Sequence, residues 1–187
     1  MNLNEIFMWT GSLIALGLYL PLISGILRDK IEQSFATWLL WVSLDLIALI
    51  SIILQKGNYL VLVFYVIGGT ITSCTLLYKG QFKWTWFETF VSFMVLICLI
   101  FWWLSGSRIA TISSTIAVVI SGLPQFKESW QKPDRVTGFI YLGYVVVNVF
   151  FFFGGKNWTI EDRFYPGSMI PLCMAIAFAA LRRGRST

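Results

Sequence analysis

The chain has 187 residues, of which 57% are hydrophobic and 12% are charged, and its mean hydropathy is +0.76. A soluble core of this length cannot bury so much apolar surface, so the composition excludes an ordinary soluble domain and indicates a membrane protein. The net charge of +5 comes from Lys and Arg residues spread over many loops, which argues against a nucleic-acid partner.

Seven apolar stretches have about the 17 to 25 residues that a helix needs to cross a lipid bilayer. In chain order they are Ile6 to Leu27, Phe35 to Leu54, Tyr59 to Tyr78, Trp84 to Leu104, Ile109 to Gln125, Gly138 to Phe153 and Tyr165 to Leu181. We therefore predict an all-α membrane protein with seven transmembrane helices.

The positions of the basic residues predict the orientation of the chain. Ten of the 14 Lys and Arg residues fall on one side of the predicted bundle, and the other four are Lys56, Arg108, Lys156 and Arg163. Because cytoplasmic loops are enriched in Lys and Arg, we expect the N-terminus outside and the C-terminus in the cytoplasm.

The second and sixth predicted helices carry matching residues. The first set is Trp38, Trp41 and Asp45, and the second set is Tyr141, Tyr144 and Asn148. Each member of the second set follows its counterpart by 103 positions. The spacing of i, i+3 and i+7 places each set on one helix face. Two such faces turned toward each other would form an aromatic cage with one polar group from each half, which we predict to be a substrate site.

This internal repeat predicts the organisation of the chain. We expect a three-helix repeat over residues 1–80, a linker helix over 81–107 and a second three-helix repeat over 108–187. Three crossings are an odd number, so the linker helix is needed to make the two repeats parallel, an arrangement known in transporters.

The third helix of each repeat contains residues that weaken helical hydrogen bonding. These are Gly68 and Gly69 in the first repeat and Pro171, at the position equivalent to Gly68, in the second. They indicate either a bend that lines a cavity or close helix packing at small residues.

A motif at the end of the fifth predicted helix resembles that of a known family. Pro124 and Gln125 are followed by Trp130, Lys132 and Thr137, a pattern similar to the PQ-loop motif of SWEET-type sugar transporters and cystinosin-like exporters. The first repeat has Pro21-Leu22 in place of the proline-glutamine pair. The resemblance covers nearly the whole chain and implies a transporter that alternates between outward-open and inward-open shapes.

The resemblance also implies roles for single residues. Pro21 and Pro124, with Gln125, would form the hinges of the two repeats, and the alternative for both prolines is simple helix termination. An acid like Asp45 is associated with proton coupling in cystinosin-like members, whereas sugar-carrying members use asparagines, as at Asn148.

Asp45 is the one carboxylate predicted deep in the bilayer, where a charged Asp costs about 2.5–3.5 kcal/mol. Burial disfavours its charged form, which suits reversible protonation, and the alternative is a structural hydrogen bond to a Ser or Thr. Glu88 is a second candidate acid, although its position next to Lys83 and Trp84 favours an interfacial role. The aromatic residues could also be interfacial anchors, Trp38 above all.

The sequence contains no histidine, which excludes a His-ligated metal site, a histidine proton relay and a Ser-His-Asp triad. It also has no clustered carboxylates and no Gly-rich phosphate loop, so we predict neither an enzyme nor a bound metal or cofactor.

We therefore predict a membrane transporter that moves a small polar solute, such as a sugar or an amino acid, by alternating access. The alternative is a non-transporting receptor or membrane chaperone of the KDEL-receptor type, which would need basic side chains inside its cavity. The expected partners are the solute and the lipid bilayer, and the sequence leaves open whether the chain forms a homo-oligomer. The short tail without a tyrosine-based sorting signal favours a prokaryotic cytoplasmic membrane over a lysosome.

Overall fold

The computed structural model describes residues 2–54, 60–104, 107–155 and 157–182. Within these ranges the chain forms eight helices and no strand. The helices are α1 (Leu3–Leu27), α2 (Phe35–Leu54), α3 (Leu60–Tyr78), α4 (Trp86–Leu104), α5 (Ser107–Ser121), α6 (Leu123–Gln131), α7 (Arg135–Gly154) and α8 (Ile160–Leu181). The prediction of an all-α fold is confirmed.

The fifth predicted span, Ile109 to Gln125, is not one uninterrupted helix. The N–H of Gly122 donates to the carbonyl of Val119, three residues back, at 3.1 Å, and the helix breaks there into α5 and α6. Pro124 follows at the start of α6, where its missing N–H costs no helical hydrogen bond. In the first half of the chain, by contrast, α1 continues through Pro21.

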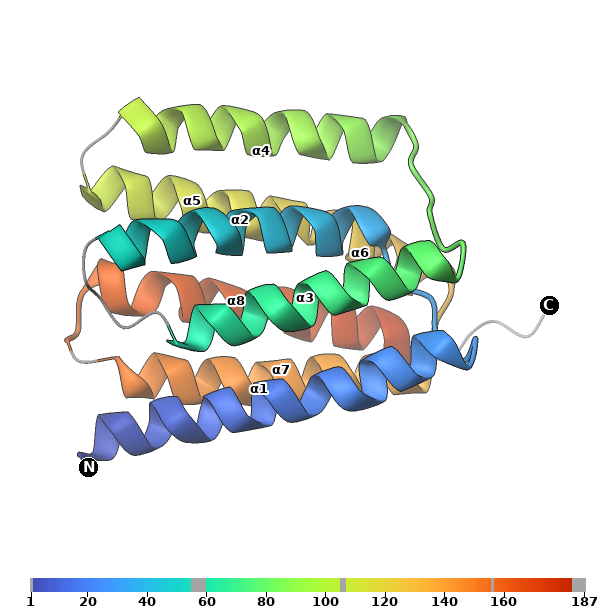
Figure 1. The fold of residues 1–187 in the computed structure, drawn as a ribbon, viewed down its shortest axis with the longest axis horizontal. Coiled ribbons are helices and arrows are strands. Elements are labelled where there is room, and N and C mark those ends of the chain that lie inside the picture. Colours follow the sequence, from blue (N-terminus) through green and yellow to red (C-terminus); the bar gives the residue numbers. More distant parts are fainter. Residues whose placement is uncertain (1, 55–59, 105–106, 156, 183–187) are drawn as a thin grey trace.

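The helices lie side by side along the long axis of the molecule, and the start of α1 and the end of α8 are at opposite ends (Figure 1). Among the described residues, three helical stretches are long and apolar enough to cross a membrane: Leu3–Leu27, Arg135–Gly154 and Asp162–Leu181. Large apolar side chains also cover the outer faces, for example Leu20, Phe139 and Phe178, which are 74%, 64% and 68% exposed. Both features fit a helical membrane protein.

The helices make contacts in two similar sets. In the first half of the chain α3 packs against both α1 and α2, and in the second half α8 packs against both α5 and α7. Contacts between the halves are also paired, because α1 packs on α7 and α2 packs on α5. Helix α4 packs mainly on α5 at the edge of the bundle (Figure 1).

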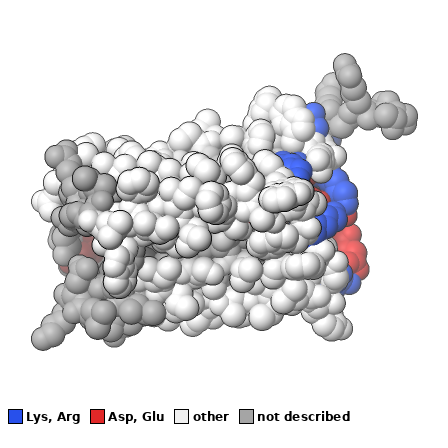
Figure 2. Space-filling model, turned by 90° about the horizontal axis from the view of Figure 1, so that it is seen from above, with Lys and Arg blue, Asp and Glu red and all other residues white. Residues whose placement is uncertain are grey.

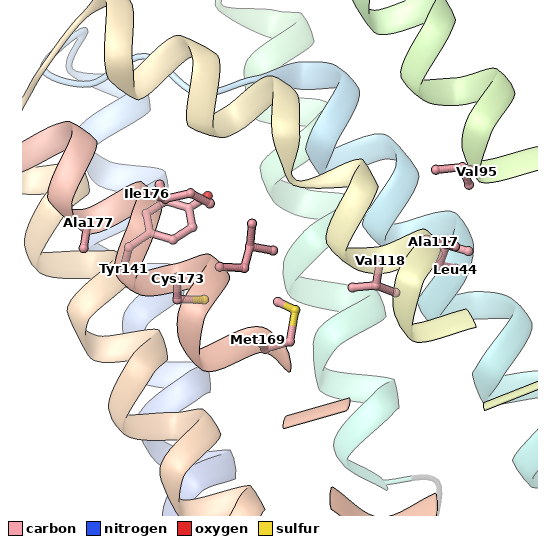
Figure 3. Close-up of a cluster of buried hydrophobic side chains, with 10 residues drawn as sticks. Leu44, Val95, Ala117, Val118, Tyr141, Met169, Cys173, Ile176 and Ala177 are labelled. Carbon is pink, nitrogen blue, oxygen red and sulfur yellow. The ribbon is translucent and has the colours of Figure 1, made fainter. Parts of the chain in front are cut away.

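A cluster of buried apolar side chains fills the space between α5 and α8. Figure 3 shows Met169, Cys173 and Ile176 along α8, and Val118 of α5 between Met169 and Ala117. Tyr141 of α7 is fully buried in the same cluster. The cluster therefore holds together the helices that form one wall of the cavity described below.

The charged residues gather at one end of the bundle, which we call the basic end (Figure 2). It holds the connections that follow α1, α3 and α6 and the end of α8 (Figure 1). Of the four basic residues expected at the other end, Lys56 and Lys156 lie outside the described residues, as does the side chain of Arg108. Arg163, near the start of α8, lies at that other end and donates to the carbonyls of Asn157 and Gly155, both at 3.0 Å.

Candidate functional site

One cavity lies between the two halves of the bundle, and all six residues of the predicted substrate site line it. Its walls are formed by Tyr19, Trp38, Trp41, Val42, Asp45, Tyr65, Gly69, Tyr141, Tyr144, Asn148, Tyr165, Met169 and Cys173. The cavity volume is about 60 Å³. A single water molecule needs about 10–15 Å³ by this measure, so the cavity holds only a few waters in this conformation.

The α2 wall begins next to Ser34, which caps this helix. The Ser34 hydroxyl accepts a hydrogen bond from the N–H of Thr37 at 3.3 Å, the bond that an N-cap residue makes. Trp38, Trp41 and Asp45 then follow on one face of α2, as the spacing predicted.

The two tryptophans of α2 differ in what their indole groups contact. The Trp41 N–H donates to the carbonyl of Val118 at 3.1 Å. The break at Gly122 leaves that carbonyl available, because the Gly122 N–H bonds to Val119 instead. Trp38 is 3% exposed, and its indole N–H has no hydrogen-bond partner among the described residues. Trp38 is therefore buried against the cavity rather than anchored at a membrane interface.

Asp45 shares the cavity with several tyrosines. Tyr19, Tyr65 and Tyr165 lie close enough to interact with it electrostatically, and they come from three different helices. Within the described ranges, no donor is hydrogen-bonded to the Asp45 carboxylate. The alternative of a structural hydrogen bond to a Ser or Thr is therefore not seen in the part of the chain that the structure describes.

The α7 wall carries the second predicted set. Asp134 caps this helix by accepting from the N–H of Val136 at 2.8 Å. The fully buried Tyr141 donates its hydroxyl to Gln33 at 3.4 Å, and the Asn148 side-chain amide donates to the carbonyl of Tyr144 at 2.8 Å. One N–H of Asn148 is thus used within its own helix, and the rest of the amide faces the cavity.

The aromatic rings of the cavity form a continuous wall across three helices. Trp41 packs edge-on against Trp38 with ring centroids 5.4 Å apart, and Trp38 lies 6.1 Å from Tyr19. Tyr19 lies 6.5 Å from Tyr144, which lies 5.9 Å from Tyr141. These distances are typical of aromatic pairs, so the rings of the two predicted sets are joined through Tyr19.

Sequence reasoning missed Tyr19, Tyr65 and Tyr165. Each lies at a position whose counterpart 103 residues away is not aromatic, so the repeat did not reveal them. A different signal could have found two of them. Tyr65 and Gly69 are spaced by four, and Tyr165 begins a stripe with Met169 and Cys173 at the same spacing, which places each group on one helix face.

Gly68 and Gly69 allow close packing at the cavity. Helix α3 runs through both without interruption. A Cβ at Gly68 would clash with the ring of Tyr19, and one at Gly69 would lie 2.5 Å from Val42. Helix α8 is likewise continuous through Pro171. The packing interpretation therefore fits this conformation better than a bent helix.

The three predicted hinge residues lie in different settings. Pro21 lies inside α1, and Pro124 follows the break between α5 and α6. Gln125 is fully buried. Its side-chain oxygen accepts from the backbone N–H of Ser34 at 2.6 Å, and its backbone N–H donates to the Thr37 hydroxyl at 3.0 Å. Gln125 thus joins the start of α6 to the start of α2.

Further polar contacts join segments of the two halves at the basic end. The Gln33 side chain donates to the Thr137 hydroxyl at 2.8 Å, which links the α1–α2 connection to α7. At the surface Glu32 pairs with Lys83 at 2.7 Å and also with Lys132. Lys132 and Thr137 belong to the motif noted in the sequence, whereas Gln33 and Glu32 were not singled out, because their partners are far apart in the sequence.

Glu88 lies at the start of α4 and does not line the cavity. Its carboxylate accepts from the N–H of Thr85 at 2.7 Å and lies 3.5 Å from the Lys127 ammonium group. This geometry is that of a helix-capping acid and favours the interfacial role over proton transfer through the cavity.

In the ranges that the structure describes, no group of three His, Cys, Asp or Glu side chains could hold a metal ion. Comparisons with models of protein families, with curated proteins and with solved structures gave no match for this chain.

Proposed function

We propose that this protein is a membrane transporter that moves a small polar solute by alternating access through the cavity between its two halves. The observation that supports the proposal most strongly is the convergence of two residue sets, 103 positions apart in the sequence, on one cavity. An aromatic wall with a few polar groups is typical of small-molecule sites.

The proposed architecture is the one of PQ-loop transporters, with two parallel three-helix repeats joined by α4. The paired contacts support it, since α3 and α8 each lie between the other two helices of their half. The basic end, with most of the described Lys and Arg residues, would face the cytoplasm, which leaves the N-terminus outside. A prokaryotic cytoplasmic membrane is the proposed location.

In this conformation the cavity would be closed toward the cytoplasm. Gln125 and Gln33 contribute buried hydrogen bonds between the two halves at that end. The cavity is also too small for a sugar or an amino acid, so the rings must separate for a solute to bind. Breaking the few hydrogen bonds near Pro124 is a low-cost way to open the cytoplasmic side.

The alternative of a receptor that grips a peptide carboxylate has less support. Such a receptor needs a basic side chain in its cavity, and no Lys or Arg is among the lining residues that the structure describes.

Uptake into proteoliposomes tests the proposed function. We expect at least one member of a panel of labelled sugars, amino acids and vitamins to be transported by the wild-type protein. If transport is proton-coupled, its dependence on a pH gradient should disappear in Asp45→Asn and persist in Glu88→Gln, the matched control at the basic end. Among the described titratable groups, Tyr19, Tyr65 and Tyr165 interact electrostatically with Asp45, so Tyr→Phe variants of these three complete the pH test. Absence of transport for every solute at every pH would refute the proposal.

A further inference from the structure

Asp45 is a partly buried acid that lines the cavity. Among the described residues that line the cavity, it is the one with a formal charge, and none is Lys or Arg. The described basic residues nearest in sequence, Arg28 and Lys30, lie in the connection between α1 and α2 at the basic end. A charge that is withdrawn from bulk water and has no partner is disfavoured, and none of the described lining residues supplies a cation, so a charged Asp45 would be stabilised by a cationic ligand.

The rings around Asp45 are suited to a cation. Trp38, Trp41 and Tyr19 form one contiguous group, and Tyr65 and Tyr165, from two further helices, line the same cavity and interact electrostatically with the carboxylate. The faces of Trp and Tyr rings attract ammonium groups, and cages of such rings recognise quaternary ammonium ligands.

A second observation also indicates a ligand. The indole N–H of Trp38 is buried at the cavity wall without a partner among the described residues. Because an unpaired buried donor is costly, this N–H is available to an acceptor oxygen of the ligand. Asn148 lines the cavity from α7, and its side-chain oxygen accepts no hydrogen bond from the described residues.

From this arrangement we infer that the solute is a small organic cation, a protonated or quaternary amine, whose positive group sits between the Asp45 carboxylate and the rings of Tyr65 and Tyr165. A hydroxyl or carbonyl oxygen of the same solute reaches the Trp38 indole. The inference rests on the proposed function, because it takes the cavity to be a solute site, and it specifies the chemical class of that solute.

Binding of a matched pair of probes to the purified protein in nanodiscs tests the inference without relying on transport. Choline and 3,3-dimethylbutan-1-ol have nearly the same shape, but only choline carries a positive charge. Isothermal titration calorimetry should show that choline binds more tightly by at least about tenfold, as expected for a buried charge pair. Equal binding of the two probes, or binding of neither, would overturn the inference.

Variants locate the site. Asp45→Asn should remove the preference for choline, whereas Asp45→Glu should keep it. Tyr165→Leu should weaken choline binding by about three- to tenfold, and by more than Tyr165→Phe, which retains the ring. A choline preference that survives Asp45→Asn would also overturn the inference, and the wild-type comparison remains decisive if a variant does not fold.

The two proposals fail in different ways. If the liposome panel shows transport of neutral sugars only, with no charge preference in the binding test, the cation inference is wrong and the proposed function stands. If choline binds with the expected dependence on Asp45 but no solute crosses the bilayer, the transporter proposal is wrong and the cation site stands.

Discussion

The indole N–H of Trp41 on α2 donates to the backbone carbonyl of Val118 on α5 at 3.1 Å. This bond joins the two halves of the chain at the point where α5 ends and α6 begins. The Val118 carbonyl also accepts from the Ser121 hydroxyl at 2.7 Å, so two side chains replace the helical bond that the break removes. A residue of the predicted substrate site is therefore also part of the scaffold.

Trp41→Phe should destabilise the fold because it removes this bond and keeps an aromatic ring. The lost hydrogen bond should contribute about 0.5–1.5 kcal/mol. Reversible unfolding in sodium dodecyl sulfate micelles measures the loss. Trp38→Phe is the matched control, because it removes the same part of the indole ring but the Trp38 N–H has no described partner, so Trp41→Phe should lose about 0.5–1.5 kcal/mol more than Trp38→Phe. Equal losses in the two variants would show that the Val118 bond contributes nothing.

Gly68→Ala should also destabilise the protein, because the added methyl group meets the ring of Tyr19. Overpacking of this kind costs about 1–3 kcal/mol, and it would push Tyr19 from its place in the aromatic wall. A thermal-stability series in detergent provides the measurement. At Gly17 a Cβ would meet no heavy atom within 4 Å, so Gly17→Ala should be neutral or stabilising, by up to about 1 kcal/mol. The reverse order of the two variants would contradict the packing seen at Gly68.

Gln125→Leu should loosen the closed basic end. The first half of the chain has Leu22 at the equivalent position, so the change makes the two halves alike. The variant leaves the Ser34 N–H without its acceptor, which should destabilise the closed conformation by about 1 kcal/mol. This change should raise the population of molecules with an open basic end about fivefold.

Labelling of the native Cys173, which lines the cavity and is 1% exposed, reports on this opening. With Cys74 and Cys98 replaced by alanine, a water-soluble maleimide applied to the basic end should react about fivefold faster in Gln125→Leu. Gln131→Leu, at the exposed end of α6, is the control and should react at the parent rate. An unchanged rate in Gln125→Leu would remove this residue from the closure of the cavity.

The ion pairs of Glu32 give the basic end a dependence on acid. Burial raises the pKa of the Glu32 carboxyl, but hydrogen bonds from Lys132 and Lys83 outweigh this effect and lower the pKa from 4.5 to about 2. A depressed pKa in the folded state means that the pairs stabilise the fold above pH 4.5 and that this stability is lost as the pH falls toward 2. The wild-type melting temperature should therefore fall more steeply than that of Glu32→Gln over this range.

The effect of Glu32→Gln at neutral pH should be small. The Glu32 side chain is 40% exposed, and exposed pairs contribute about 0.2–1 kcal/mol. Asp29→Asn is a suitable control. Among the described residues Asp29 pairs with Lys79 alone, at 2.5 Å, whereas Glu32 joins its own loop to the loops that carry Lys83 and Lys132. If the melting temperatures of Glu32→Gln and the wild type fall equally between pH 4.5 and 2, the prediction is contradicted.

The sequence predicted the helices well because each lies between clear boundaries. Helix α2 has the predicted bounds, Phe35–Leu54, because Ser34 caps it and charged residues precede it. The break at Gly122 was not predicted. The Gly122 N–H bonds to Val119 instead of to Val118, and hydropathy does not detect a change in a single backbone hydrogen bond.

The site was predicted only as far as the repeat extends. The two matched sets on α2 and α7 line the cavity as their spacing indicated. Tyr19 joins these sets only because Gly68 lets α1 approach α3, and no pattern within α1 shows that. The partners of Trp41 and Tyr141 were equally hidden, since Val118 and Gln33 are distant in the sequence.

Access to Asn148 from each side of the membrane tests the central claim most directly. The protein would carry Asn148→Cys with Cys74, Cys98 and Cys173 replaced by alanine, in vesicles of both orientations. A transporter with its solute site in this cavity predicts that a water-soluble maleimide reacts with this position from either side, and that a transported solute slows both reactions. Reaction from neither side, or from one side only with or without solute, would contradict alternating access through the cavity.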